Sequence, residues 1–112
     1  MHELQIAGEV IKIARAEMKR RRLTRISEIG LAVGALAAVD PDALAFSFEA
    51  SVVDTPLAGS RLHIDFIPVE GTCRNCRRDF KVSDYVFICP HCGSGDILVR
   101  RGEELDVTYI LA

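Results

Sequence analysis

The chain has no tryptophan, and its aromatic residues amount to only 6% of 112 positions. Its net charge of −2 also lacks the excess of Lys and Arg that a dedicated nucleic-acid-binding domain usually carries. No apolar run approaches the roughly 20 residues that cross a bilayer, and the first residues do not resemble a secretory signal. We therefore expect a cytoplasmic protein that binds neither nucleic acid nor membrane.

Four cysteines stand in two close pairs, and in a reducing compartment such pairs indicate a metal site rather than disulfides. The first pair is Cys73-Arg-Asn-Cys76, the second is Cys89-Pro-His-Cys92, and residues 77–88 separate them. Each Cys-x-x-Cys turn directs two thiolates at one point, and Gly93 suits the positive φ that closes such a turn. Two turns complete a closed tetrahedral shell, which predicts a structural zinc site.

The same spacing leaves a second metal open, because a rubredoxin-like iron site also uses two Cys-x-x-Cys turns. His91 lies within the second turn and is expected to be an exposed loop residue rather than a ligand. Arg74, Arg77 and Arg78 lie close enough in sequence to offset the negative charge of a metal held by four thiolates. A closed shell leaves no position for a substrate, so this site explains structure rather than activity.

The hydrophobic pattern predicts an α+β fold. Apolar residues from Leu4 to Met18 recur at spacings of three and four, as in an amphipathic helix. Asp40-Pro41 has the composition of a helix start, with Asp as N-cap and Pro in the first turn. The expected order is helix 3–22, strand 26–34, a helix from Asp40-Pro41, strand 61–67, the cysteine segment 70–101 and strand 104–111.

Two strands joined through a helix favour a parallel pair, and the cysteine segment reads as an insertion before the last strand. We therefore predict a three-stranded mixed sheet with two helices, plus a small inserted zinc-ribbon-like domain. The predicted domains are residues 1–69 with 102–112, which form an α/β domain, and residues 70–101, which bind zinc.

A second metal site is indicated where the sequence begins Met1-His2-Glu3. A free α-amine, the amide and imidazole of His2 and the amide of Glu3 can form a plane of nitrogen ligands, which suits Ni(II) or Cu(II). Met1 is expected to be retained, because initiator removal usually requires a small second residue. The alternative is a frayed, exposed end that binds no metal. In that case the negative charge of Glu3 in the first turn stabilises the helix through the helix dipole.

Three features in this order resemble the HypA/HybF family over essentially the whole chain. They are Met-His-Glu-Leu opening a helix, the stretch Val-Asp-Pro-Asp-Ala-Leu-x-Phe-x-Phe-Glu at residues 39–49, and two Cys-x-x-Cys turns followed by a Gly-x-Glu-Leu strand at residues 102–105.

The resemblance implies a nickel metallochaperone for [NiFe]-hydrogenase and, in some bacteria, for urease. It implies two partners, the GTPase HypB and the hydrogenase large subunit, with urease accessory proteins where urease is served. It places nickel at Met1, His2 and Glu3, and zinc at Cys73, Cys76, Cys89 and Cys92. Asp40 is a weaker candidate for a nickel ligand, because its expected role is the helix N-cap.

No arrangement of catalytic residues is visible, and no Gly-rich phosphate loop with Lys occurs, so we expect a transfer protein rather than an enzyme. His63 is expected to be an exposed strand residue. Two other classes remain open from the residues themselves: a zinc-ribbon nucleic-acid module that uses arginines near the cysteines, and an iron electron carrier.

Overall fold

The computed structural model describes residues 2–112 and divides the chain into two compact units. Within the described residues, the helical unit comprises residues 2–32, Val39–Asp65 and Asp106–Ala112, and the cysteine unit comprises Val33–Ala38 and Phe66–Leu105. Each unit has buried side chains of its own.

Helix α1 (Glu3–Arg21) is amphipathic as predicted, but its buried stripe begins one residue earlier than expected. Leu4 is 61% exposed, whereas Glu3 is 5% exposed and lies in line with the buried Ala7. The other buried residues of α1 are Val10, Ala14 and Met18. The helix ends where Arg22 adopts the left-handed conformation with φ 56° and its N–H returns to a carbonyl of the last turn, a common helix ending.

Helix α2 (Pro41–Ser51) begins as the sequence predicted. The side chain of Asp40 accepts hydrogen bonds from the backbone N–H groups of Asp42 and Ala43 at 3.0 and 3.3 Å, so Asp40 is the N-cap. The inward side of α2 carries Leu44 and Phe48, both fully buried. Within residues 2–112, no helix combines the length and the apolar character that crossing a membrane requires.

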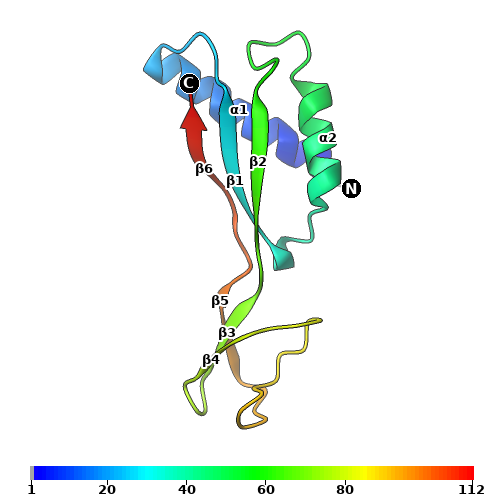
Figure 1. Cartoon of the computed structure of the whole chain (residues 1–112), viewed down its shortest axis with the longest axis vertical. Coiled ribbons are helices and arrows are strands. Elements are labelled where there is room, and N and C mark those ends of the chain that lie inside the picture. Colours follow the sequence, from blue (N-terminus) through cyan, green and yellow to red (C-terminus); the bar gives the residue numbers. More distant parts are fainter. Residues whose placement is uncertain (1) are drawn as a thin grey trace. The chain divides into compact units, whose positions relative to one another are not determined.

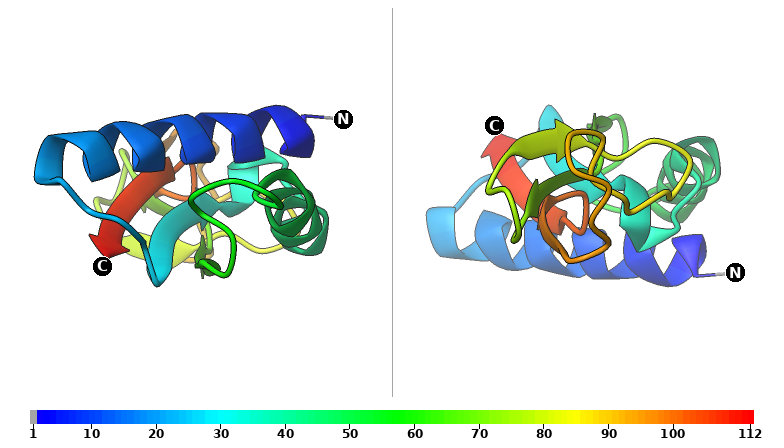
Figure 2. Two further views of the ribbon diagram at one scale, coloured as in Figure 1. Left: turned by 90° about the horizontal axis from the view of Figure 1, so that it is seen from above. Right: turned by 90° about the horizontal axis from the view of Figure 1, so that it is seen from below.

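A three-stranded sheet has the order β2-β1-β6, formed by β1 (Glu28–Gly34), β2 (Arg61–Ile67) and β6 (Leu105–Leu111). The backbone of Ser27 links all three: its carbonyl accepts from Arg61 N–H, and its N–H donates to Leu111 O. Thus β1 and β2 start side by side, whereas the start of β1 meets the end of β6. In the helical unit α1 lies across one face of the sheet, and α2 packs beside α1 (Figures 1 and 2). The expected mixed sheet with two helices is confirmed.

The cysteine unit contains a second, antiparallel sheet of order β4-β3-β5, formed by β3 (Glu70–Cys73), β4 (Asp79–Lys81) and β5 (Ile97–Arg101). Gly71 at its centre pairs with Phe80 on one side and Val99 on the other. A short 3₁₀ turn, η1 (Ala35–Ala37), also belongs to this unit. The segment with the cysteines lies between β2 and β6 in the chain, as expected for an insertion.

Two close approaches explain the glycines of β1. A Cβ atom on Gly30 would lie 2.0 Å from the Tyr109 ring, and one on Gly34 would lie 2.1 Å from the carbonyl oxygen of Gly102. The space above Gly30 lets the Tyr109 hydroxyl donate to Glu28 at 2.5 Å. Glu28 also forms an ion pair of 2.9 Å with Arg61, so one carboxylate connects all three strands.

Candidate metal centres

The two Cys-x-x-Cys turns have the same backbone hydrogen bonds. In the first turn, Cys73 O accepts from Arg77 N–H at 2.7 Å, and Cys73 N–H donates to Arg78 O at 2.9 Å. In the second turn, Cys89 N–H likewise donates to the carbonyl five residues later, that of Ser94, at 2.8 Å, and Cys89 O accepts from Gly93 N–H at 2.9 Å. The repeated geometry positions the cysteines as two equivalent pairs.

The residue that closes each turn has a positive φ. Gly93, where the sequence predicted this conformation, has φ 77°, and Arg77 has φ 64° at the equivalent position of the first turn. The positive φ of Arg77 could not be predicted, because an arginine in the left-handed conformation carries no compositional signal.

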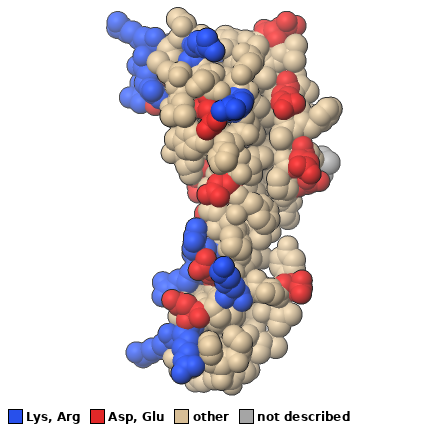
Figure 3. All heavy atoms as spheres, viewed as in Figure 1, with Lys and Arg blue, Asp and Glu red and all other residues tan. Residues whose placement is uncertain are grey.

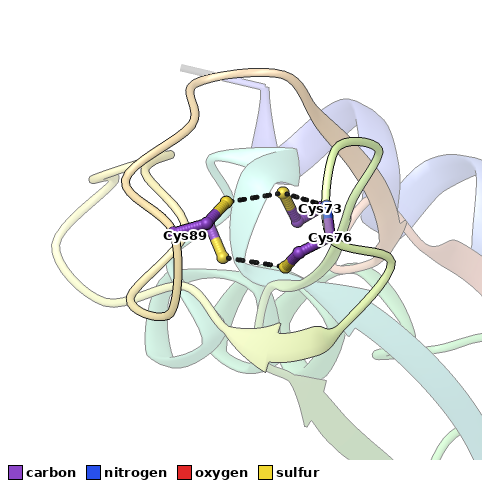
Figure 4. A group of neighbouring side chains, drawn as sticks. Cys73, Cys76 and Cys89 are labelled. Atoms are coloured by element: carbon purple, nitrogen blue, oxygen red, sulfur yellow. Dashed lines mark hydrogen bonds between the residues drawn. The ribbon is translucent and has the colours of Figure 1, made fainter.

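The four thiols gather at one point and fit a tetrahedral ion. Their sulfur atoms all lie within 4.8 Å of one another, with Cys73–Cys92 at 3.5 Å and Cys76–Cys89 at 3.6 Å. Zinc–sulfur bonds of about 2.3 Å place tetrahedral sulfurs about 3.8 Å apart, close to these separations. Figure 4 shows the side chains of Cys73, Cys76 and Cys89 pointing toward one another. The residues therefore fit the predicted closed four-sulfur shell.

The surroundings shift the pKa values of two of the thiols in opposite directions. Hydrogen bonds from the Ser94 N–H and the Asn75 amide, together with the Cys73 thiol, lower the pKa of Cys92 to about 6. The Arg78 N–H favours the thiolate of Cys76, but burial and the neighbouring cysteines outweigh it and raise its pKa to about 11. A cluster of thiols that share protons in this way favours a dication, which replaces those protons.

Two of the arginines near the cysteines have polar side-chain partners. Arg74 lies 3.6 Å from the carboxylate of Asp96, and Arg78 lies 3.3 Å from the Nδ1 atom of His91. His91 is exposed, as expected for a loop residue, and its backbone N–H donates to the Cys89 sulfur at 3.4 Å. The second turn therefore uses the backbone of His91 to support a thiolate.

The residues predicted to hold nickel lie at the start of α1, except that Met1 lies outside the described residues. His2 is exposed and its carbonyl accepts from Ile6 N–H at 2.9 Å, so its backbone begins the helix. Glu3 points inward instead: its Oε2 accepts from the backbone N–H of Asp40 at 3.1 Å. Its Oε1 is buried and has no hydrogen-bond partner among residues 2–112.

The Asp40 N–H lowers the pKa of Glu3, although burial of the carboxyl opposes this shift. The N–H of Glu3 itself and the electrostatic effect of His2 lower the pKa of Glu3 in the same direction as Asp40. Glu3 is therefore ionised at neutral pH, and its carboxylate joins the starts of the two helices. Sequence reasoning missed this contact, because nothing local in the sequence marks a bond between residues so far apart.

The cysteines are the one group of three or more His, Cys, Asp or Glu side chains within residues 2–112 that is placed to hold an ion. The side chains of His2, Glu3 and Asp40 do not converge in this way. Within residues 2–112, side chains alone therefore do not form a metal site at the start of α1.

A mixed α/β unit with an inserted closed four-cysteine site defines a small metal-binding protein. A sequence model of the family described as "Hydrogenase/urease nickel incorporation, metallochaperone, hypA" matches residues 1–112. The chain belongs to this HypA family, as the sequence motifs indicated.

Curated relatives of similar length support this family assignment. The hydrogenase maturation factor HypA of Geotalea uraniireducens is 41% identical over 107 residues, covering 96% of this chain and 94% of the relative. The hydrogenase maturation factor HybF of Klebsiella pneumoniae is 36% identical, covering 96% and 95%. The solution structure of the Ni metallochaperone HypA from Helicobacter pylori superimposes with a TM-score of 0.68 at 21% identity, covering 99% and 97%, and shows the same fold.

Proposed function

We propose that this protein is a nickel metallochaperone that binds Ni(II) at its N-terminus and delivers it for maturation of [NiFe]-hydrogenase. Membership of the HypA family carries this proposal, together with the names of its relatives as hydrogenase maturation factors. Urease is a second client that the family description allows. The protein acts in the cytoplasm as a transfer protein rather than as an enzyme.

In this proposal, residues 1–69 with 102–112 carry nickel, and residues 70–101 carry zinc on the four cysteines. Nickel is held by the Met1 amine, the amide and imidazole of His2 and the amide of Glu3. The exposure of His2 supports this arrangement, because a partner protein can reach a metal ion held by an exposed ligand and take it over. Asp40 is the weaker candidate for an oxygen ligand, since its side chain also caps α2. Because the amine and imidazole must lose protons, nickel affinity falls in acid.

Zinc, held as a resident ion, keeps the cysteine unit folded, and the four thiols of Cys73, Cys76, Cys89 and Cys92 are its ligands. An iron electron carrier is the alternative that the same four sulfurs allow. Purified protein without visible colour, with zinc as the bound metal by elemental analysis, supports the zinc assignment. A coloured protein with a reversible redox couple would establish iron instead.

The partners in this proposal are the GTPase HypB and the hydrogenase large subunit, with urease accessory proteins where urease is the client. A zinc-ribbon nucleic-acid module is the rival class. The net charge of −2 and the scarcity of aromatic residues weigh against it, because such modules usually carry excess positive charge and aromatic side chains on which bases stack. DNA binding with a steep salt dependence would revive this rival.

The test is a Ni(II) titration of zinc-loaded protein with a native Met1, beside a form with two extra residues before Met1. The extension removes the α-amine from the site and leaves every side chain unchanged. We expect one tight nickel ion on the native chain and at least a tenfold weaker affinity on the extended chain. His2→Ala should show the same loss, whereas His63→Ala, which alters an exposed residue of β2, should bind as the parent does. Equal affinity of the native and extended chains would refute the terminal site.

A further inference from the structure

The outward face of helix α2 exposes a large apolar side chain among polar ones, although the solvent-facing side of a helix is usually polar. Phe46 is 72% exposed, while its neighbours Leu44 and Phe48 are fully buried. Phe46 and Ala50 are four residues apart and lie on one side of the helix, and Val53 follows in the turn just after the C-cap Val52. Val53 is 61% exposed. These residues form a stripe rather than a single exposed ring, and such stripes indicate contact surfaces.

Acidic residues flank this stripe. Asp42 lies one turn before Phe46 and Glu49 one turn after it, and both are exposed. No Lys or Arg occurs among residues 26–60, so no positive side chain of this segment offsets them. Figure 3 shows Asp and Glu gathered along the side of the helical unit where α2 lies, and Lys and Arg gathered toward the end of α1. The potential around the stripe is therefore negative.

The face also adjoins the proposed nickel residues within the helical unit. Helix α2 begins at its cap, Asp40, and the backbone N–H of Asp40 donates to the Glu3 carboxylate at 3.1 Å. A protein bound along α2 would therefore sit beside the residues at the start of α1.

We infer that this outward face of α2 docks a protein partner that presents an apolar pocket rimmed by Lys or Arg. The face is defined by Asp42, Phe46, Glu49, Ala50 and Val53.

Two other occupants fit the surface less well. A second copy of the chain, related by a two-fold axis, would bring the acidic residues of both copies together, because such a contact uses the same patch on each subunit. Metal cations alone would explain the carboxylates but not the exposed Phe46. An aromatic side chain in the middle of an acidic rim is the arrangement of an interface anchor.

The test measures binding of the zinc-loaded full-length protein to each of the two proposed partners, the GTPase and the hydrogenase large subunit of the same host, by calorimetry. Phe46→Ser removes the anchor and Asp42→Asn/Glu49→Gln removes the rim charges. Leu111→Ser and Asp106→Asn are the matched controls, because they change an exposed apolar and an acidic residue of β6 in the same unit. Circular dichroism checks that each variant is folded.

We expect Phe46→Ser to weaken binding to one of the partners at least about 30-fold, as loss of an interface anchor does. The double charge variant should slow association and flatten its salt dependence, and both controls should bind as the parent does. Equal binding by the parent and Phe46→Ser would overturn the inference. So would an equal loss in Leu111→Ser, or no binding of the parent to either partner.

This inference rests on the proposed function only for the choice of partners. Nickel titration of the same variants distinguishes failure of the docking inference from failure of the proposed nickel function. Phe46→Ser should keep the nickel affinity of the parent, because it alters no proposed ligand. If nickel does not bind but partner binding still depends on Phe46, the proposed function fails and the docking face stands.

Discussion

At the scale of single residues, the carboxylate of Glu3 joins two helices that are distant in sequence. Its Oε2 accepts from the Asp40 N–H, while its Oε1 is buried without a partner among residues 2–112. A buried oxygen without a hydrogen bond is costly, and one that persists at a proposed binding site is available to another ligand. Glu3 is therefore both a structural link and a candidate for contact with a bound ion.

The hydrogen bond from Tyr109 to Glu28 should make stability depend on pH. This bond, together with Arg61, lowers the pKa of Glu28 from its usual 4.5, although burial opposes the shift. A carboxylate with a lowered pKa in the folded state stabilises the protein above its unfolded pKa, and this contribution is lost as pH falls through the folded pKa. Tyr109→Phe should therefore lower the urea midpoint at pH 7 and have a smaller effect toward pH 3. An equal loss at both pH values would show that the ring, not the hydrogen bond, matters.

Gly30→Ala should destabilise the protein by about 1–3 kcal/mol, because the new methyl group must displace the Tyr109 ring in a packed contact. Urea unfolding measures this loss. In the background of Tyr109→Ala, where the ring is gone, the same substitution should cost much less. Additive losses in the double variant would contradict this explanation.

How far the sequence predicted these residues depends on how local their signal is. The four cysteines and the cap at Asp40 were predicted, because short spacing patterns specify both. The Glu3–Asp40 bond and the outward position of Phe46 were not, because they depend on how elements distant in sequence pack together. The exposed Leu4 was expected in the core for the same reason, since periodicity does not show where a partner element ends.

At the scale of elements, helix α2 starts at a strong N-cap that also meets Glu3. The cap uses Oδ1 of the Asp40 side chain, whereas the bond to Glu3 uses the Asp40 backbone N–H. A substitution of Asp40 can therefore remove the cap and still leave the N–H that bonds to Glu3. The start of α2 is thus fixed from both the side chain and the main chain.

Asp40→Ala should lower stability by about 1 kcal/mol, because two backbone N–H groups lose their acceptor. Asp40→Asn keeps a good capping side chain and should be nearly neutral. Urea unfolding compares the two variants, and a nickel titration of Asp40→Asn tests the oxygen-ligand role independently of the cap. An equally large loss of stability in Asp40→Asn would indicate that the charge, rather than the cap, is important.

Helix α1 contains a glycine whose replacement by alanine should increase the stability of the protein. A Cβ atom at Gly8 meets no other atom within 4 Å, and Gly in a helix costs about 0.5–1 kcal/mol relative to Ala. Gly8→Ala should therefore raise the free energy of unfolding by that amount in urea titrations. Gly59→Ala is the contrasting variant, because Gly59 has φ +88° and alanine is strained there. It should lower stability.

At the scale of the whole molecule, the two units depend on different kinds of stabilisation. The helical unit buries large apolar side chains such as Phe48 and Leu57, whereas the fully buried side chains of the cysteine unit include two of the four thiols. Small domains of this kind draw most of their folding free energy from the bound ion, on the order of 10–16 kcal/mol in zinc-finger peptides.

Removing the metal with a chelator at neutral pH should therefore unfold the cysteine unit and leave the helical unit folded. In an NMR spectrum of backbone amides, the dispersed signals of residues 66–105 should collapse, while those of α1 and α2 persist. Cys76→Ser should give the same spectrum without chelator. Simultaneous loss of signals from both units would show that they fold as one.

The position of the cysteine segment between β2 and β6 makes it a loop of the larger sheet. Without metal, residues 68–104 become a flexible connection that must still close so that β6 can pair with β1. Closure entropy grows only with the logarithm of loop length, by about 0.6 kcal/mol for each doubling. The stability of the sheet therefore depends little on the length of this segment, so evolution can lengthen, shorten or replace the cysteine segment while the fold of the helical unit stays intact.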